Sequence, residues 1–179
     1  MAAAPAHAQD SDGKVQVKLL GSYVIPDGKI TAVNEDIVSL PDTLQTEANE
    51  NFVPTLAVEY FVSTNFSVET ICCMTQHDVD AVSGLPNAEL VSDAKLIPAT
   101  LTAKYHLDAG AVKPYVGAGA TYFWWVDVEP GADTIPLGVT RTTLSDELGL
   151  VLQAGADIAI GDQGLGLTLD AKRYFVDTT

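Results

Sequence analysis

The sequence lacks a long apolar run, and no window approaches the roughly 18 consecutive apolar residues that a membrane-spanning helix needs. It also has few basic residues, because 24 Asp and Glu against 9 Lys and Arg give a formal net charge of -15. Nucleic-acid-binding proteins need a basic surface, so we exclude nucleic acid as a partner. If the chain crosses a membrane, strands must do the crossing.

Cysteine and histidine are also scarce. Cys72 and Cys73 are neighbours, so on a strand they point to opposite faces and cannot easily bridge each other. The histidines His7, His77 and His106 are scattered, with no second Cys or His at the spacing of a metal site. We interpret each histidine as an ordinary polar residue and expect no metal and no other cofactor.

The N-terminal segment contains Ala6-His7-Ala8, an A-x-A pattern typical of signal-peptide cleavage, followed at once by polar residues. The alternative is a disordered alanine-rich terminus. We expect residues 1–8 to be the remnant of a signal peptide and residues 9–179 to form the exported domain.

Residues 113–125 combine small, β-branched and aromatic residues after a proline, a composition that predicts a single long strand. Strands of soluble domains are typically about five or six residues long, whereas a strand tilted across a bilayer needs about 9–11. One face is apolar and ends in aromatics, as a lipid-facing surface should: Val116, Ala118, Ala120, Tyr122, Trp124 and Val126.

This stretch has two alternative interpretations. Gly117-Ala118-Gly119 resembles the start of a dinucleotide-binding loop, but the third glycine and the following helix are missing. A strand of a soluble β-sandwich is the stronger rival. The remainder of the chain distinguishes the sandwich from a membrane barrel.

Similar alternation predicts six further strands, at residues 15–25, 52–62, 66–76, 95–107, 147–160 and 164–176. The connections alternate between long polar loops at 26–51, 77–94 and 127–145 and short turns at 63–65, 108–111 and 161–163. Outer-membrane barrels have long outer loops and short periplasmic turns. We therefore predict an all-β, antiparallel, up-and-down transmembrane β-barrel. Single-chain barrels of this kind have an even number of strands, so we expect eight in the full protein and seven in this sequence.

Four short motifs connect the predicted strands to a known family. They are Lys113-Pro114-Tyr115-Val116-Gly117-Ala118-Gly119, Leu96-Ile97-Pro98-Ala99-Thr100-Leu101, Val68-Glu69 after a short turn, and Leu144-Ser145-Asp146 before a glycine-rich strand. From about Val15 onward the sequence resembles the OmpW family of small eight-stranded outer-membrane barrels, without the family's closing strand. The resemblance implies export to the Gram-negative outer membrane, contact with its lipid, and passive uptake of small hydrophobic molecules through a lumen with an apolar constriction.

Charged residues on the inward faces predict a polar cluster near the periplasmic end. Glu59 and Glu69 are equally far from the turn centred on Thr64, so strand pairing sets them opposite each other. Lys104 and Asp157 each precede a short turn by four residues, which places them at the same level. Facing carboxylates repel, so Lys104 or a shared proton must compensate. Two interpretations remain open: an inert ionic core that fills a narrow barrel, and a polar plug that closes the periplasmic end of the lumen.

The same alternation assigns the larger apolar and aromatic residues to two groups. The expected apolar lining of the lumen consists of Leu20, Phe61, Ile71, Phe123 and Trp125. The expected girdle at the lipid interfaces consists of Tyr60, Tyr105, Tyr122 and Trp124.

The sequence offers no nucleophile, base and orienting group that could work together, so we expect no enzymatic activity. Paired carboxylates also occur in glycosidases, but no second domain is present to form a cleft. Two functions remain open. One is a conduit for small apolar molecules, and the other is a structural or surface-interaction barrel whose acidic loops bind ions or partners.

Overall fold

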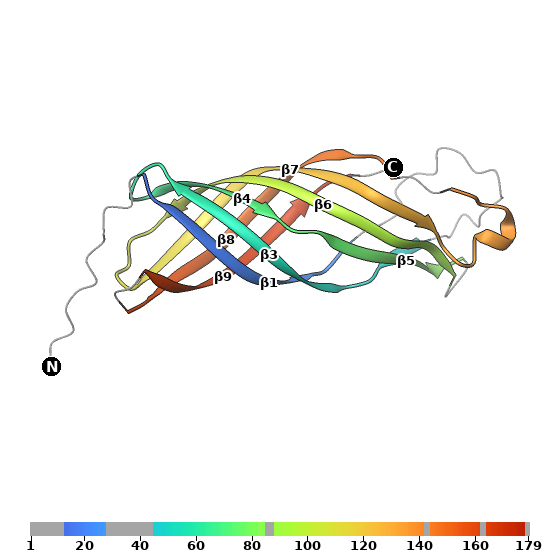
Figure 1. Cartoon of the computed structure of the whole chain (residues 1–179), viewed down its shortest axis with the longest axis horizontal. Helices are drawn as coiled ribbons and strands as arrows, with labels where there is room; N and C mark the ends of the chain where they lie inside the picture. The colour runs from blue at the N-terminus through green and yellow to red at the C-terminus, as the bar shows by residue number, and fades with distance from the viewer. Residues whose placement is uncertain (1–12, 28–44, 85–87, 142–143, 162–163, 178–179) are drawn as a thin grey trace.

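The computed structural model describes residues 13–27, 45–84, 88–141, 144–161 and 164–177, and it shows an antiparallel sheet curled into a nearly closed barrel (Figure 1). Seven strands follow the barrel wall in the order β1 (Val15–Val24), β3 (Asn51–Phe61), β4 (Phe66–Cys72), β6 (Glu89–His106), β7 (Val112–Pro130), β8 (Glu147–Ile160) and β9 (Leu165–Phe175). The predicted all-β antiparallel barrel is therefore confirmed. The expected signal remnant lies outside the described residues.

Along the barrel wall, side chains alternate between the lumen and the outside, as the period of two along a strand requires. On β3, Val53, Ala57 and Phe61 are buried inside, whereas Leu56 and Tyr60 are exposed outside. The outward faces of all seven strands carry large apolar side chains in this way. An apolar exterior of this extent is unfavourable in water and matches contact with lipid acyl chains. Within the described ranges no helix is long and apolar enough to cross a membrane.

The sheet continues beyond the barrel at the end opposite the short turns (Figure 1). There, β5 (Thr75–Ser83) pairs with β6 on one side and with the short strand β2 (Gln45–Ala48) on the other, while β6 pairs with β7 as far as Pro130. A single turn of 3₁₀ helix, η1 (Ile135–Leu137), follows β7. We call this part, formed by β2, β5 and the outer ends of β6 and β7, the outer extension.

The outer extension corrects the predicted loops. Residues 77–94 were expected to be a polar loop, but most of them belong to β5 and β6, and the expected strand at 66–76 is divided between β4 and β5. The expected loop at 127–145 likewise begins inside β7. The expectation failed because it used an apolar outward face to recognise a strand. Outside the membrane both faces of a sheet can meet water, so polar sequences also form strands there.

The lipid-facing surface gives a stability prediction. Leu101 is 58% exposed on the outer face of β6, between Tyr105 at one end of the apolar band and the Tyr122 and Trp124 level at the other. Leu101→Arg should lower the folding stability in lipid by about 2–4 kcal/mol, because it places a cation near the bilayer midplane. The measurement is urea unfolding of the barrel in lipid vesicles.

The matched control is Val82→Arg. Val82 is 50% exposed on β5, in the outer extension, where an added charge meets water instead of lipid. Equal destabilisation by both variants would contradict the assignment of the apolar band to lipid.

Candidate functional site

The centre of the site is a lysine held between two glutamates inside the barrel. The Lys104 ammonium lies 3.0 Å from Glu59 Oε2 and 2.9 Å from Glu69 Oε2. Glu59 and Glu69 are directly paired across β3 and β4, as the sequence predicts. All three side chains are almost completely buried, with at most 1% of each residue exposed. The lysine between the carboxylates offsets the repulsion that this pairing creates.

Two further lysines extend this arrangement across the lumen. Lys18 on β1 reaches Glu59 Oε2 at 2.7 Å and Asp157 Oδ1 at 2.9 Å. Lys172 on β9 reaches Glu69 Oε1 at 3.2 Å and Asp170 Oδ1 at 2.6 Å. Gln153 on β8 donates from Nε2 to Glu69 and to Asp170, at 2.9 and 2.6 Å. The contacts join strands on opposite sides of the barrel, so they fill the lumen at this level.

Tyr115 packs against Lys104, the lysine between the two glutamates. Its ring centroid lies 3.7 Å from the Lys104 ammonium, a cation–π contact, and its hydroxyl donates to Asp170 at 2.6 Å. Gly155, paired with Tyr115 across β7 and β8, leaves room for the ring, because a Cβ there would come within 2.6 Å of Tyr115 Cζ. Gly117 does the same for Lys104, whose Cγ would lie 3.0 Å from an added Cβ. These glycines allow large polar side chains to fill a narrow lumen.

His106 and Ser67 complete the cluster on the side of the short turns. His106 Nε2 lies 2.9 Å from Glu59 Oε1 and 2.8 Å from Ser67 Oγ, and the Ser67 hydroxyl also donates to Glu59. The rings of Phe61 and Tyr115 flank the imidazole at centroid distances of 5.1 and 5.3 Å. We call these residues together the lumen cluster: Lys18, Glu59, Ser67, Glu69, Lys104, His106, Tyr115, Gln153, Asp157, Asp170 and Lys172.

The four predicted plug residues are brought together, although not in one shared contact. Lys104 binds Glu59 and Glu69, while Asp157 joins them through Lys18. Sequence reasoning missed the other members and interpreted His106 as an ordinary polar residue. Alternation alone gives a signal for several of them, because Lys18, Asp170 and Lys172 occupy inward positions of strands that were correctly placed.

The predicted apolar lining lies on both sides of the lumen cluster. Leu20, Ile71, Phe123 and Trp125 lie between the cluster and the outer extension, where Phe123 also contacts the Tyr174 ring at a centroid distance of 5.9 Å. Phe61 faces the lumen too, but it follows Glu59 toward the short turn and packs against His106. The lumen is therefore ionic at one level, and on the side of the outer extension apolar and aromatic side chains are interspersed with buried threonines such as Thr55, Thr100 and Thr121.

The four predicted girdle residues all project outward. Tyr60 and Tyr105 lie near the short turns, and their exposed fractions are 48% and 41%. Tyr122 and Trp124 lie toward the outer extension, with exposed fractions of 44% and 53%. These positions bracket the apolar band from both ends, which is where amphipathic rings are found in membrane barrels.

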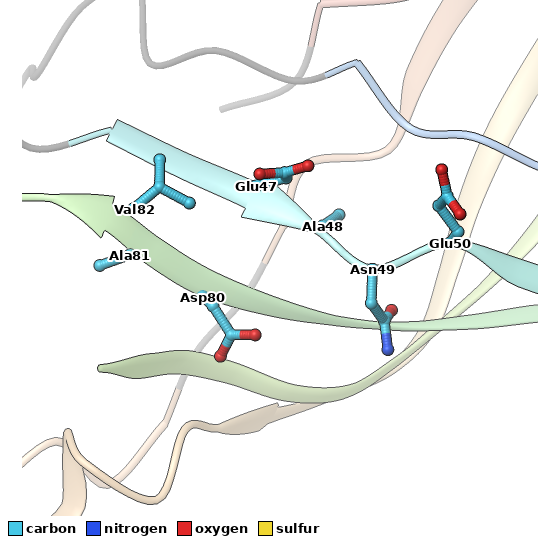
Figure 2. Close-up of a pocket in the computed structure, with 7 residues that line it drawn as sticks. All are labelled: Glu47, Ala48, Asn49, Glu50, Asp80, Ala81 and Val82. Atoms are coloured by element: carbon cyan, nitrogen blue, oxygen red, sulfur yellow. The ribbon is translucent and has the colours of Figure 1, made fainter. Parts of the chain in front are cut away.

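A separate hollow of ≈ 470 Å³ lies on the outer extension, between β2 and β5 (Figure 2). Its acidic residues are Glu47, Glu50 and Asp80, and Figure 2 shows that their carboxylates do not point toward a common centre. Across the described parts of the chain, no group of three or more His, Cys, Asp or Glu could hold a metal ion. Elsewhere on the extension, a hydrogen bond of 3.0 Å to Asp127 raises the pKa of Lys95.

Comparisons with known proteins agree with this geometry. The model of the OmpW family matches residues 11–179. The outer-membrane protein y4mB of Sinorhizobium fredii is 32% identical over 94% of this chain and 67% of its own length. Outer membrane protein W of Vibrio cholerae is 24% identical over 79% of this chain and 68% of its own length. The crystal structure of OprG from Pseudomonas aeruginosa shares the fold, with a TM-score of 0.76, 21% identity, and coverage of 96% of this chain and 82% of that chain.

The buried ion pairs give a second stability prediction. Lys104→Met removes the ammonium group that contacts Glu59 and Glu69 at 3.0 and 2.9 Å, and it leaves Lys18, at 2.7 and 3.7 Å, as the one described cation that contacts both. Breaking these buried ion pairs should destabilise the folded barrel by about 3–5 kcal/mol. Lys95→Met is the control, because Lys95 pairs with Asp127 in water and its loss should change stability little. Both are measured by urea unfolding in lipid vesicles, and a similar small effect of the two would argue against a tightly coupled cluster.

Proposed function

Because the chain belongs to the OmpW family of outer-membrane barrels, we propose that it provides a narrow, apolar-lined conduit for passive uptake of small apolar molecules. It is a barrel of the Gram-negative outer membrane, with its outward apolar side chains in contact with lipid. The short turns mark the periplasmic end, and the outer extension faces the exterior.

The observation that carries this proposal is the division of the lumen into two zones. Toward the exterior no charged pair among the described residues fills it, and its lining combines threonines such as Thr55, Thr100 and Thr121 with the apolar and aromatic residues Leu20, Ile71, Phe123, Trp125 and Tyr174. Toward the periplasm it is filled by the lumen cluster. Apolar side chains that face the lumen offer a favourable environment to an apolar solute and a poor one to ions.

The lumen cluster determines where the solute leaves. To pass it, a molecule would have to separate ion pairs such as Lys104–Glu59 and Lys18–Asp157 in a region shielded from water. Separating buried pairs costs several kcal/mol, and an apolar solute cannot replace the lost contacts. The proposed route therefore enters from the exterior and leaves sideways, through the barrel wall into the lipid.

A structural or surface-interaction role is the second candidate. It is favoured by the contacts that cross the lumen, such as Gln153–Glu69 and Lys172–Glu69, because they make the interior resemble a packed core. The acidic hollow on the outer extension would then be the functional surface, with ions or partners as its ligands. This role requires no movement of solute through the lumen.

Solute entry tests the conduit directly. We expect the full-length, refolded barrel to accelerate entry of 1-N-phenylnaphthylamine into vesicles with lipopolysaccharide in the outer leaflet, measured by its fluorescence increase. Phe123→Asp should slow entry several-fold, because it puts a charge in the apolar zone, whereas Val82→Asp on the outer extension should leave the rate unchanged. Equal rates with and without the barrel would rule out the conduit and favour the second candidate.

Ion conductance tests the plug separately. Glu59→Gln combined with Glu69→Gln removes two charges from the cluster, so single-channel conductance in planar bilayers should change from that of the unmodified barrel. Probe entry should stay near the unmodified rate, because the proposed exit precedes the cluster. Heat-modifiable mobility on a gel verifies folding. A double variant with normal conductance and blocked probe entry would contradict the lateral route.

A further inference from the structure

The lumen cluster contains one more carboxylate than ammonium group. Glu59, Glu69, Asp157 and Asp170 supply four carboxylates, and Lys18, Lys104 and Lys172 supply three ammonium groups, which leaves a charge of 4 − 3 = 1 negative unit. An unbalanced charge is costly where water is excluded, because the protein interior solvates it poorly. The only other member that can become a cation is His106, which is 1% exposed.

Protonating one of the carboxylates would be an unfavourable way to neutralise the excess negative charge, because all eight oxygens already accept a hydrogen bond or face an ammonium group. Glu59 Oε1 contacts Ser67 and His106, and its Oε2 contacts Lys18 and Lys104. The other oxygens are occupied as follows: Glu69 by Gln153, Lys172 and Lys104; Asp157 by Lys18 and Thr168; Asp170 by Lys172, Tyr115 and Gln153. Protonating any oxygen would weaken one of these contacts.

The hydrogen bonds of His106 fix the position of its first ring proton. The Ser67 hydroxyl donates to Glu59 Oε1, so Ser67 Oγ can only accept from His106 Nε2. The Glu59 carboxylate, at 2.9 Å, is also an acceptor, so Nε2 carries a hydrogen. The second ring nitrogen, Nδ1, is buried and has no hydrogen-bond partner among the described residues. Gln153 Oε1 is also buried without a partner, but an amide oxygen does not bind a proton near neutral pH, so Nδ1 is the one open basic atom among the described members of the lumen cluster.

We propose that Nδ1 of His106 is a proton-binding site, and that uptake of one proton makes the lumen cluster electrically neutral and strengthens the plug. The groups around the imidazole have opposite effects on a positive charge placed there. Glu59 from β3 attracts the added charge, Lys104 from β6 opposes it, and Ser67 from β4 and Tyr115 from β7 are neutral. Lys18 from β1 acts through Glu59. The excess carboxylate supplies the negative charge that the added proton would balance.

The location of His106 connects this site to the periplasm. His106 ends β6, where its backbone N–H donates to Asn65 O and its carbonyl accepts from Asn65 Nδ2, both at 2.8 Å. Asn65 belongs to the short turn between β3 and β4, at the periplasmic end. Because His106 lies at this end of the barrel, the proposed site would exchange its proton with the periplasm. The inference is independent of whether the lumen carries solute.

Nitrogen NMR of the full-length barrel in detergent, labelled with ¹⁵N histidine, tests the site without any substitution. At pH 8 the ring shifts of His106 should show hydrogen at Nε2 only, and at pH 5.5 they should show hydrogen on both nitrogens. A neutral ring at both values, or hydrogen at Nδ1 only, would overturn the proposal. His106→Gln identifies the signal.

Unfolding in urea tests the consequence for the plug. The urea concentration at half-unfolding should be higher at pH 5.5 than at pH 8, because the balancing charge is present at the lower pH. His106→Gln should lose this difference. His77→Gln should keep it, because both ring nitrogens of His77 contact neutral groups, Thr75 Oγ1 and Asn49 O. A pH difference that persists unchanged in His106→Gln would show that His106 does not carry the balancing proton.

Discussion

The arrangement inside this barrel depends on one contact, the Lys104 ammonium between the carboxylates of Glu59 and Glu69. Strand pairing forces the two glutamates to face each other, so this register is stable only if a cation lies between their carboxylates. Once Lys104 is placed, Tyr115 covers it, and Gly117 and Gly155 must stay small to leave space. Gly117 leaves space for Lys104, and Gly155 leaves space both for the Tyr115 ring and for the Leu169 carbonyl of β9.

The alternation of strand residues allowed much of this to be predicted. The long strand at 113–125, the facing of Glu59 and Glu69, and the inward direction of Phe123 all follow from a period of two and short turns of fixed position. These features depend on local geometry, which can be deduced from the spacing of residues along the chain.

Other features were not predictable, because they depend on distances across the lumen. Nothing in the spacing of Lys18 and Asp157 shows that their side chains meet at 2.9 Å, since these residues lie on β1 and β8 and have no backbone pairing between them. His106 was misjudged for the same reason. The strands of the outer extension were missed because their polar faces resemble loop sequence when burial is unknown.

The length of β7 determines how far the barrel wall extends beyond the apolar band. At about 3.4 Å per residue, its 19 residues extend for on the order of 65 Å, and a tilt near 45° leaves about 45 Å along the barrel axis. The apolar band is only about 25 Å tall, so the wall rises on the order of 20 Å past it. This raised wall is one-sided: it is formed by β2, β5, β6 and the end of β7, whereas the pairing of β7 with β8 ends at Phe123 and Glu147.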